Sequence, residues 1–253
     1  MNGRPVLKPT AAADETFAGV TYHLDGALVP ALTVEIKPDQ SVYFEHHIML
    51  WKNPEVSIVV KPIAGAVKRM LAGMPVFVTE ATGNGMISFS RDGAGQIIAL
   101  HLAEMEEIHV REHQFLAATK NVDYMYERVT GIVNMMAGQT GFFIDKFRCH
   151  EGEGILWLHG YGNVFEKVLA PGEQIEVEPG AWLYRDASVT METNVQTLSS
   201  GLFGSANMIT NRFTGPGRIG IQSMYAGGPG SEAGSSGGGG LMGFLAGLFV
   251  AEA

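Results

Sequence analysis

One stretch of this sequence recurs, and the recurrence constrains the fold more than any other feature. Residues 36–57 align without a gap with residues 169–190, so that Leu50 matches Leu183. A weaker third copy lies between them and places Leu116 at the same position. The alignment therefore predicts three degenerate copies of a unit of about 66 residues. One repeat is usually one supersecondary unit that packs on its neighbours.

A second motif recurs in the same order. A glycine turn at residues 83–85, 152–154 and 215–217 precedes a short apolar run each time. Two motifs in one order three times favour duplication over chance reuse of turns. The predicted repeats cover about residues 19–84, 85–151 and 152–226.

The pattern within each copy predicts β-structure. Residues 41–45 and 174–178 alternate apolar and polar side chains, which is the period of a half-buried strand. Pro-Gly and Pro-Asp turns separate such runs, as in sandwiches and barrels. Residues 122–137 have approximate helical spacing, but the repeat alignment predicts strands there and is preferred.

Three like units suggest a pseudo-threefold β-prism, because a triangular arrangement lets each unit cover the exposed sheet edge of its neighbour. The predicted fold class is therefore all-β, with the three units forming the prism. On this model the matched Leu50, Leu116 and Leu183 are equivalent core residues, each expected to be buried.

The glycine-rich third copy resembles a known family. Residues 171–173 (Pro-Gly-Glu), 178–184, 201–204 and 212–222 are similar to the altered-inheritance-of-mitochondria twenty-four family, and the resemblance covers about residues 17–225. It implies three repeats related to the tryptophan RNA-binding attenuation protein, a short double-stranded β-helix. It implies no catalytic residues. The first copy departs from the pattern, with His46-His47 where Pro-Gly is typical.

Charge and cysteine content exclude some function classes. The 253 residues carry a net charge of -9, and the 17 basic residues are scattered, which argues against a phosphate-binding surface. Cys149 is the single cysteine, so no intrachain disulfide can form and a reducing, cytoplasmic location is expected. Neither a secretory signal nor an apolar run long enough to span a bilayer is evident.

The candidate chemical residues do not combine into a site. His109 and His113 share a face of a strand but lie roughly 13 Å apart there, so they are not expected to bind a catalytic metal. Neighbouring Cys149 and His150 point to opposite faces of a strand, which opposes a nucleophile–base pair. No catalytic, cofactor-binding or metal-ligating residue is predicted, and no cofactor.

The ends of the chain differ from its centre. Residues 1–16 are predicted to be an extension, 17–226 the repeat domain, 227–240 a flexible glycine-rich linker and 241–253 an apolar tail. The tail has helical apolar spacing and is expected to contact a membrane surface weakly, or another subunit. The residues on the apolar face of this expected helix are Leu241, Phe244, Leu245, Leu248 and Phe249.

These features predict a non-enzymatic structural, scaffolding or partner-binding protein that forms a homo-oligomer, binds an unknown protein partner and is cytoplasmic or membrane-peripheral. One alternative is a module that binds a small ligand or nucleic acid, although the net negative charge of the chain disfavours nucleic acid. Another is a metal-dependent cupin-like enzyme.

Overall fold

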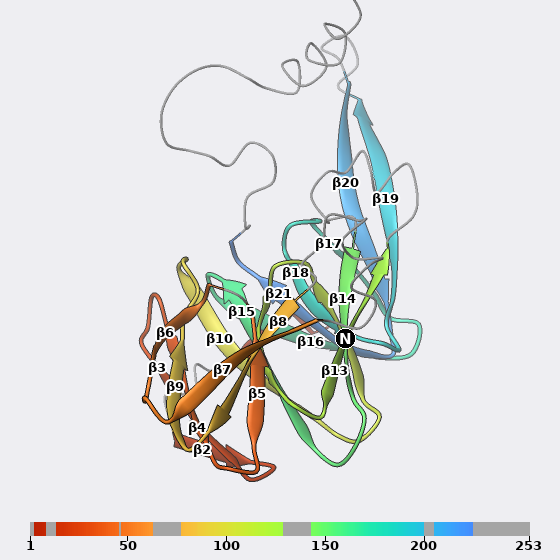
Figure 1. Cartoon of the computed structure of the whole chain (residues 1–253). Helices are drawn as coiled ribbons and strands as arrows, with labels where there is room; N and C mark the ends of the chain where they lie inside the picture. The colour runs from red at the N-terminus through yellow and green to blue at the C-terminus, as the bar shows by residue number, and fades with distance from the viewer. Residues whose placement is uncertain are drawn as a thin grey trace, which may run out of the picture.

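The computed structural model describes residues 3–8, 14–45, 47–62, 77–128, 143–199 and 205–224. Every regular element in these residues is a β-strand, so the all-β prediction is confirmed (Figure 1). In the part of the chain that the structure describes, no helix could cross a membrane. The linker and the tail, residues 227–253, lie outside the described residues.

The described strands form an N-terminal group and three sets of six. The N-terminal strands are β1 (Val6–Leu7), β2 (Asp14–Phe17) and β3 (Val20–Asp25). The first set is β4 (Ala31–Ile36), β5 (Ser41–Phe44), β6 (Met49–Lys52), β7 (Val56–Pro62), β8 (Phe77–Gly83) and β9 (Gly85–Phe89). The second set is β10 (Gly95–Leu102), β11 (Glu107–Arg111), β12 (Phe115–Thr119), β13 (Val122–Arg128), β14 (Phe143–Cys149) and β15 (Gly154–Tyr161). The third set is β16 (Val164–Leu169), β17 (Gln174–Val177), β18 (Trp182–Asp186), β19 (Thr190–Ser199), β20 (Ser205–Thr214) and β21 (Gly217–Gln222).

Within each set the same antiparallel pairs form. The first strand pairs with the sixth, the sixth with the third, the second with the fifth, and the fifth with the fourth. The pairing of the third strand with the sixth contains a register shift in every set. The glycine turn before the sixth strand has a steric reason: Gly83 has a φ of +125°, and a Cβ there would lie 2.3 Å from the carbonyl oxygen of Glu55.

The described strands form four open sheets, and two of these sheets contain strands of neighbouring sets. β5 of the first set pairs with β12 of the second, and β11 of the second pairs with β18 of the third. No sheet of the described strands closes into a barrel. We name the sheets by strand order: sheet I is β2-β3-β4-β9-β6, sheet II is β10-β15-β12-β5-β8-β7, sheet III is β1-β16-β21-β18-β11-β14-β13, and sheet IV is β17-β20-β19.

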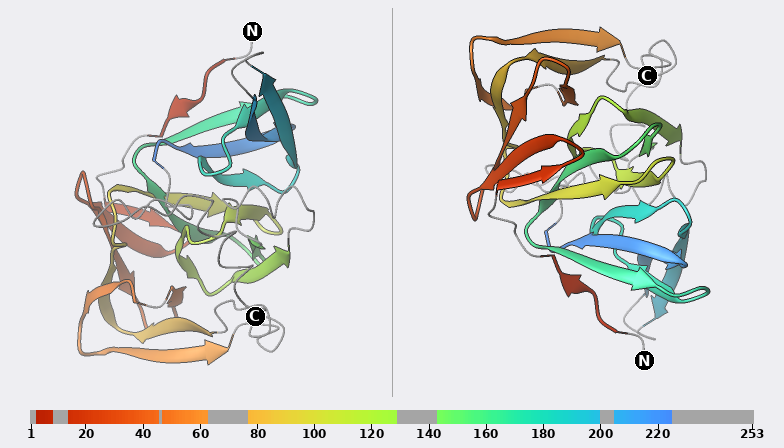
Figure 2. Two further views of the ribbon diagram at one scale, coloured as in Figure 1. Left: turned by 90° about the horizontal axis from the view of Figure 1, so that it is seen from above. Right: turned by 90° about the horizontal axis from the view of Figure 1, so that it is seen from below.

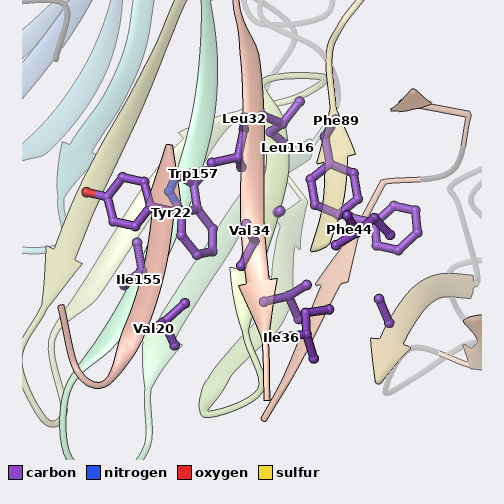
Figure 3. Close-up of a cluster of buried hydrophobic side chains, with 14 of the residues drawn as sticks. Val20, Tyr22, Leu32, Val34, Ile36, Phe44, Phe89, Leu116, Ile155 and Trp157 are labelled. Atoms are coloured by element: carbon purple, nitrogen blue, oxygen red, sulfur yellow. The ribbon is translucent and has the colours of Figure 1, made fainter. Parts of the chain in front are cut away.

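Three hydrophobic cores hold the sheets in the order I, II, III, IV. The first core joins sheets I and II, where Tyr22 meets Trp157 edge to face with ring centroids 5.3 Å apart (Figure 3). The second joins sheets II and III, and includes Phe115 and Phe147. The third joins sheets III and IV, through Trp182 and Phe213. Figure 2 accordingly shows the strands of the first set, in orange, toward one end and those of the third set, in cyan and blue, toward the other.

The N-terminal extension is part of the sheets. β1 pairs with β16 at the edge of sheet III, and β2 pairs with β3 in sheet I. Residues 122–128 form β13, as the repeat alignment predicted and against the helical spacing; residues 129–137 lie outside the described residues. Val122, Tyr124 and Tyr126 favour a strand, and pairing with β14 thus outweighs the helical pattern here.

The prediction that all three matched leucines are buried is wrong for one of them. Leu116 and Leu183 are fully buried, whereas Leu50 is 56% exposed. The reason is the place of each strand in its sheet. β12 and β18 have a strand on both sides, but β6 is the last strand of sheet I and, among the described strands, has only β9 beside it.

Candidate interaction surface

The exposed side chains of β6 form the most unusual surface of the described chain. Met49, Leu50 and Trp51 are consecutive, apolar and 40%, 56% and 46% exposed. The register shift between Met49 and Trp51 interrupts strict alternation here, but the matching residues of β12 lie in two cores, Phe115 in one and Leu116 and Ala117 in the other. The joint exposure of the three β6 residues therefore indicates that the described residues cover neither face at this place. The residues at the same positions in the second and third sets are all buried. They are Phe115, Leu116 and Ala117 in β12, and Trp182, Leu183 and Tyr184 in β18.

A second uncovered edge lies at the other end of the stack of sheets. β17 is the last strand of sheet IV and pairs only with β20 among the described strands. Gln174 and Glu176 of β17 are exposed, and Ile175 is half-buried. The strands at the same position in the other sets, β5 and β11, are almost entirely buried because each has a partner on both sides.

Each of the two edge strands carries one charged side chain, Glu176 on β17 and Lys52 on β6, and Glu176 is ion-paired with Arg212 of β20. Glu176 accepts hydrogen bonds from Arg212 Nη2 at 2.7 Å and from Asn194 Nδ2 at 3.0 Å. The Arg212 bond is the main reason that the pKa of Glu176 lies below its ordinary value, so the carboxylate is ionised at neutral pH. On β6, Lys52 extends its ammonium only to the backbone carbonyl of Asn53, at 3.4 Å, among the described contacts.

The covered edges show how sets are held together. At the first junction the Tyr43 hydroxyl donates to the carbonyl oxygen of Val122 at 2.6 Å, and Arg91 Nη2 donates to that of Phe115 at 2.7 Å. At the second junction Arg218 of the third set binds Glu106 of the second. Backbone pairing between sets is therefore reinforced by side chains that cross the junction.

The sequence-selected histidines are scattered. His109 bonds through Nε2 to Glu107 at 2.7 Å, and burial together with the nearby Arg185 lowers its pKa. His47 and His113 occupy turns with φ of 73° and 67° and are exposed. His46 lies outside the described residues. Within the residues that the structure describes, no three His, Cys, Asp or Glu side chains form a metal-ligand group.

Cys149 and His150 point to different surroundings. The Cys149 thiol is buried and donates to the carbonyl oxygen of Glu151 at 3.3 Å. His150 is exposed and approaches Asp123, with Nδ1 3.2 Å from Oδ1. Burial raises the pKa of Cys149, so this thiol is a poor nucleophile at neutral pH.

A buried polar pair escaped the sequence reasoning. His159 and Gln114 are both fully buried, and the backbone N–H of His159 donates to the carbonyl oxygen of Gln114 at 2.9 Å. Burial, helped by the positive charge of Arg91, lowers the pKa of His159 to about 4. The side-chain atoms of Gln114 and the ring nitrogens of His159 have no hydrogen-bond partner among the described residues. Positions 114 and 159 are far apart in sequence and meet only because β12 pairs with β15.

The chain was compared with known protein families and with solved structures. A family model described as mitochondrial biogenesis AIM24 matches residues 22–224. No curated protein in the comparison matches the chain. The crystal structure of a Streptococcus pyogenes protein superposes with a TM-score of 0.60 at 22% identity, covering 81% of this chain and 94% of that one. This likeness extends to the fold.

Proposed function

The chain belongs to the AIM24 family, and on that premise we propose that it is a non-enzymatic structural protein that binds protein partners and itself through uncovered sheet edges. The observation that carries the proposal is the contrast at one position of the three sets. Leu50 and its neighbours on β6 are exposed, whereas the matched residues of β12 and β18 are buried. Burying one such side chain contributes about 1.5 to 3 kcal/mol, so an open β6 edge favours association.

The edge itself adds to this preference. A strand at the end of a sheet presents unpaired N–H and C=O groups, and monomeric proteins usually blunt such edges with charges, prolines or bulges. β6 has two of these features, Lys52 and the register shift beside β9, but it also presents three consecutive large apolar side chains to solvent. Partner binding at β6 would satisfy both its backbone groups and its apolar side chains.

We also propose that the three sets are degenerate copies of one unit with a pseudo-threefold relation, like the double-stranded β-helix of the tryptophan RNA-binding attenuation protein. The identical strand pairing in the three sets and the recurrent register shift support duplication. On this proposal the units span residues 31–89, 95–161 and 164–222, with bounds that differ by up to a dozen residues from those expected from the sequence. A complete prism would need β6 alongside β17, a pair that the described strands do not form.

The proposed location is the cytoplasm, with a peripheral membrane contact through Leu241, Phe244, Leu245, Leu248 and Phe249, which lie outside the described residues. The tail carries no Lys or Arg, so several tails on one oligomer are needed for avidity. Flotation with liposomes should recover more of the full chain than of a chain ending at Ala226. Equal recovery of the two would remove the membrane contact from the proposal.

A small-ligand binding module is the second candidate, and the unpartnered amide of Gln114 beside His159 favours it. Buried polar atoms normally have a partner, and a small polar molecule could supply one. Native mass spectrometry of untreated protein tests this candidate by the mass of a co-purified molecule. Metal analysis of the same preparation tests the alternative of a cupin-like metal enzyme. Stoichiometric zinc, iron or manganese that is lost in His47→Ala or His113→Ala would support that alternative.

Sedimentation equilibrium over a wide concentration range tests self-association. We expect the full chain to associate, Trp51→Lys to remain a monomer and Val60→Lys to associate like the unmodified chain. Val60 is a matched control, since it is 59% exposed on β7, another edge strand. An unmodified chain that is monomeric at every concentration contradicts the proposal.

A further inference from the structure

The two junctions between sets use one register. At the first, Phe44 of β5 lies opposite Ala117 of β12. At the second, Val110 of β11 lies opposite Tyr184 of β18. Positions 44 and 110 match in the repeat alignment, and so do positions 117 and 184. The second strand of one set therefore pairs with the third strand of the next set at a fixed offset.

Within the described strands, the same rule leaves one strand of each kind without a partner. β17 is the second strand of the third set, and β6 is the third strand of the first set. Both end their sheets. Carrying the register over places Val177 opposite Trp51 and Glu176 opposite Lys52, because 177 matches 44 and 110, and 51 matches 117 and 184.

The layering decides which copy of each strand can meet. β6 belongs to sheet I and β17 to sheet IV, and sheets II and III with all three hydrophobic cores lie between them. One chain could pair its own β6 and β17 only by opening these cores. A second copy of the chain can present β17 to β6 with its cores intact.

We propose that β17 of one copy pairs antiparallel with β6 of the next copy, so that sheet IV of the first continues into sheet I of the second. This inference rests on the proposed self-association and names its partner and register. The joined sheet would run β2-β3-β4-β9-β6-β17-β20-β19, the five strands of sheet I plus the three of sheet IV, or eight in all. Its junction repeats the one found twice within the chain.

The side chains complement each other in this register. Lys52 faces Glu176, which already pairs with Arg212 of β20, so the ammonium would join that ion pair; opposite charges directly across an antiparallel pair are favourable. Trp51 and Leu50 gain the cover that their counterparts Ala117, Tyr184, Leu116 and Leu183 have. Because the two surfaces differ, the contact is heterologous, and successive copies form a ring if the rotation closes and a filament if it does not.

Disulfide trapping in the full chain tests the register. One preparation carries Lys52→Cys and an affinity tag, and the other carries Glu176→Cys without a tag. Directly opposed residues in an antiparallel pair have Cα atoms about 4.5 to 5.5 Å apart, within disulfide range. Cys149 stays in every chain, because it is buried and contributes no exposed thiol. On mild oxidation we expect the mixture to give a covalent dimer of one tagged and one untagged chain.

Three controls make the result specific. Replacing Glu176→Cys by Gln174→Cys moves the thiol two residues along the same face, to about 7 to 8 Å, and should reduce the dimer at least tenfold. Each single variant alone should give little dimer. A dimer from Lys52→Cys alone would overturn the proposal in favour of β6 pairing with β6.

The double variant Lys52→Cys/Glu176→Cys distinguishes copies from closure within one chain. Head-to-tail pairing predicts covalent multimers, whereas a fast-migrating covalent monomer would mean that the chain closes on itself and would overturn the proposal. Sedimentation of the unmodified chain distinguishes failure of the β6–β17 interface from failure of self-association as a whole. If the chain associates but no trap forms, this interface is wrong while self-association stands; if it never associates, both fail.

Discussion

Arg218 Nε donates to both carboxylate oxygens of Asp186, at 3.0 Å and 3.2 Å, and the same guanidinium binds Glu106 in the preceding set. The Arg218 backbone N–H also donates to Asp186, at 2.7 Å. Burial disfavours the charge of Arg218, but the two carboxylates outweigh it and raise its pKa above the ordinary value. This residue therefore joins the second and third sets by charge-assisted hydrogen bonds.

Arg218→Met should lower the free energy of unfolding by about 2 kcal/mol, because it leaves the carboxylates of Asp186 and Glu106 without their cation. Urea denaturation measures the change. Arg4→Met is the control, since Arg4 is exposed and should leave the midpoint unchanged. Equal midpoints for the two variants would show that the junction does not depend on Arg218.

Leu183→Ala and Leu50→Ala form a matched pair at one position of the repeat. We expect Leu183→Ala to lower the free energy of unfolding by about 2 to 5 kcal/mol, because burial is lost and a cavity is left behind. The exposed Leu50 should cost no more than about 0.5 kcal/mol in the monomer. Guanidinium unfolding at a concentration where the chain is monomeric compares them, and similar losses would mean that β6 is covered within the chain.

Stability should fall with pH below about 6.5 because of His159. Burial and the charge of Arg91 lower its pKa to about 4 in the folded state. The folded chain therefore takes up this proton at a lower pH than the unfolded chain does. The stabilisation is complete above the ordinary histidine pKa and is lost as the pH falls toward 4, by up to about 3 kcal/mol.

The comparison for this prediction is His159→Gln, which should flatten that part of the stability profile between pH 7 and pH 4. His113→Gln changes an exposed histidine and should retain the slope. The profiles come from thermal or urea unfolding at a series of pH values. An unchanged slope in His159→Gln would assign the acid sensitivity to other groups.

Cys149 should react slowly with a thiol reagent in the native protein. The thiol is buried and its pKa is raised by that burial, so both access and the thiolate fraction are low. Ellman's reagent should modify it at least a hundredfold faster in 6 M guanidinium than in buffer. Fast labelling of the folded chain would place Cys149 at the surface.

Much of the local structure could be predicted from patterns along the chain. Alternation at residues 41–45 and 174–178 identified β5 and β17, and the alignment of Leu50, Leu116 and Leu183 identified three third strands. These features depend on the two-residue period of a strand and on turn residues, which are properties of neighbouring positions.

The candidate surface was less predictable. The sequence treats Leu50 and Leu183 alike, since both are apolar residues in matched strands, yet only one is covered. Whether a strand has one neighbour or two depends on which set precedes it and how the sheets stack. That is a long-range property, and no local pattern at residues 49–52 contains it.

The sequence by itself determined the all-β class, several of the strands, the glycine turns and the family to which the chain belongs. Only the tertiary structure decided that β6 and β17 are open edges and that Gln114 and His159 meet in the interior. The physical reason is that strand formation follows from local side-chain alternation, whereas burial follows from pairing between residues far apart in the chain.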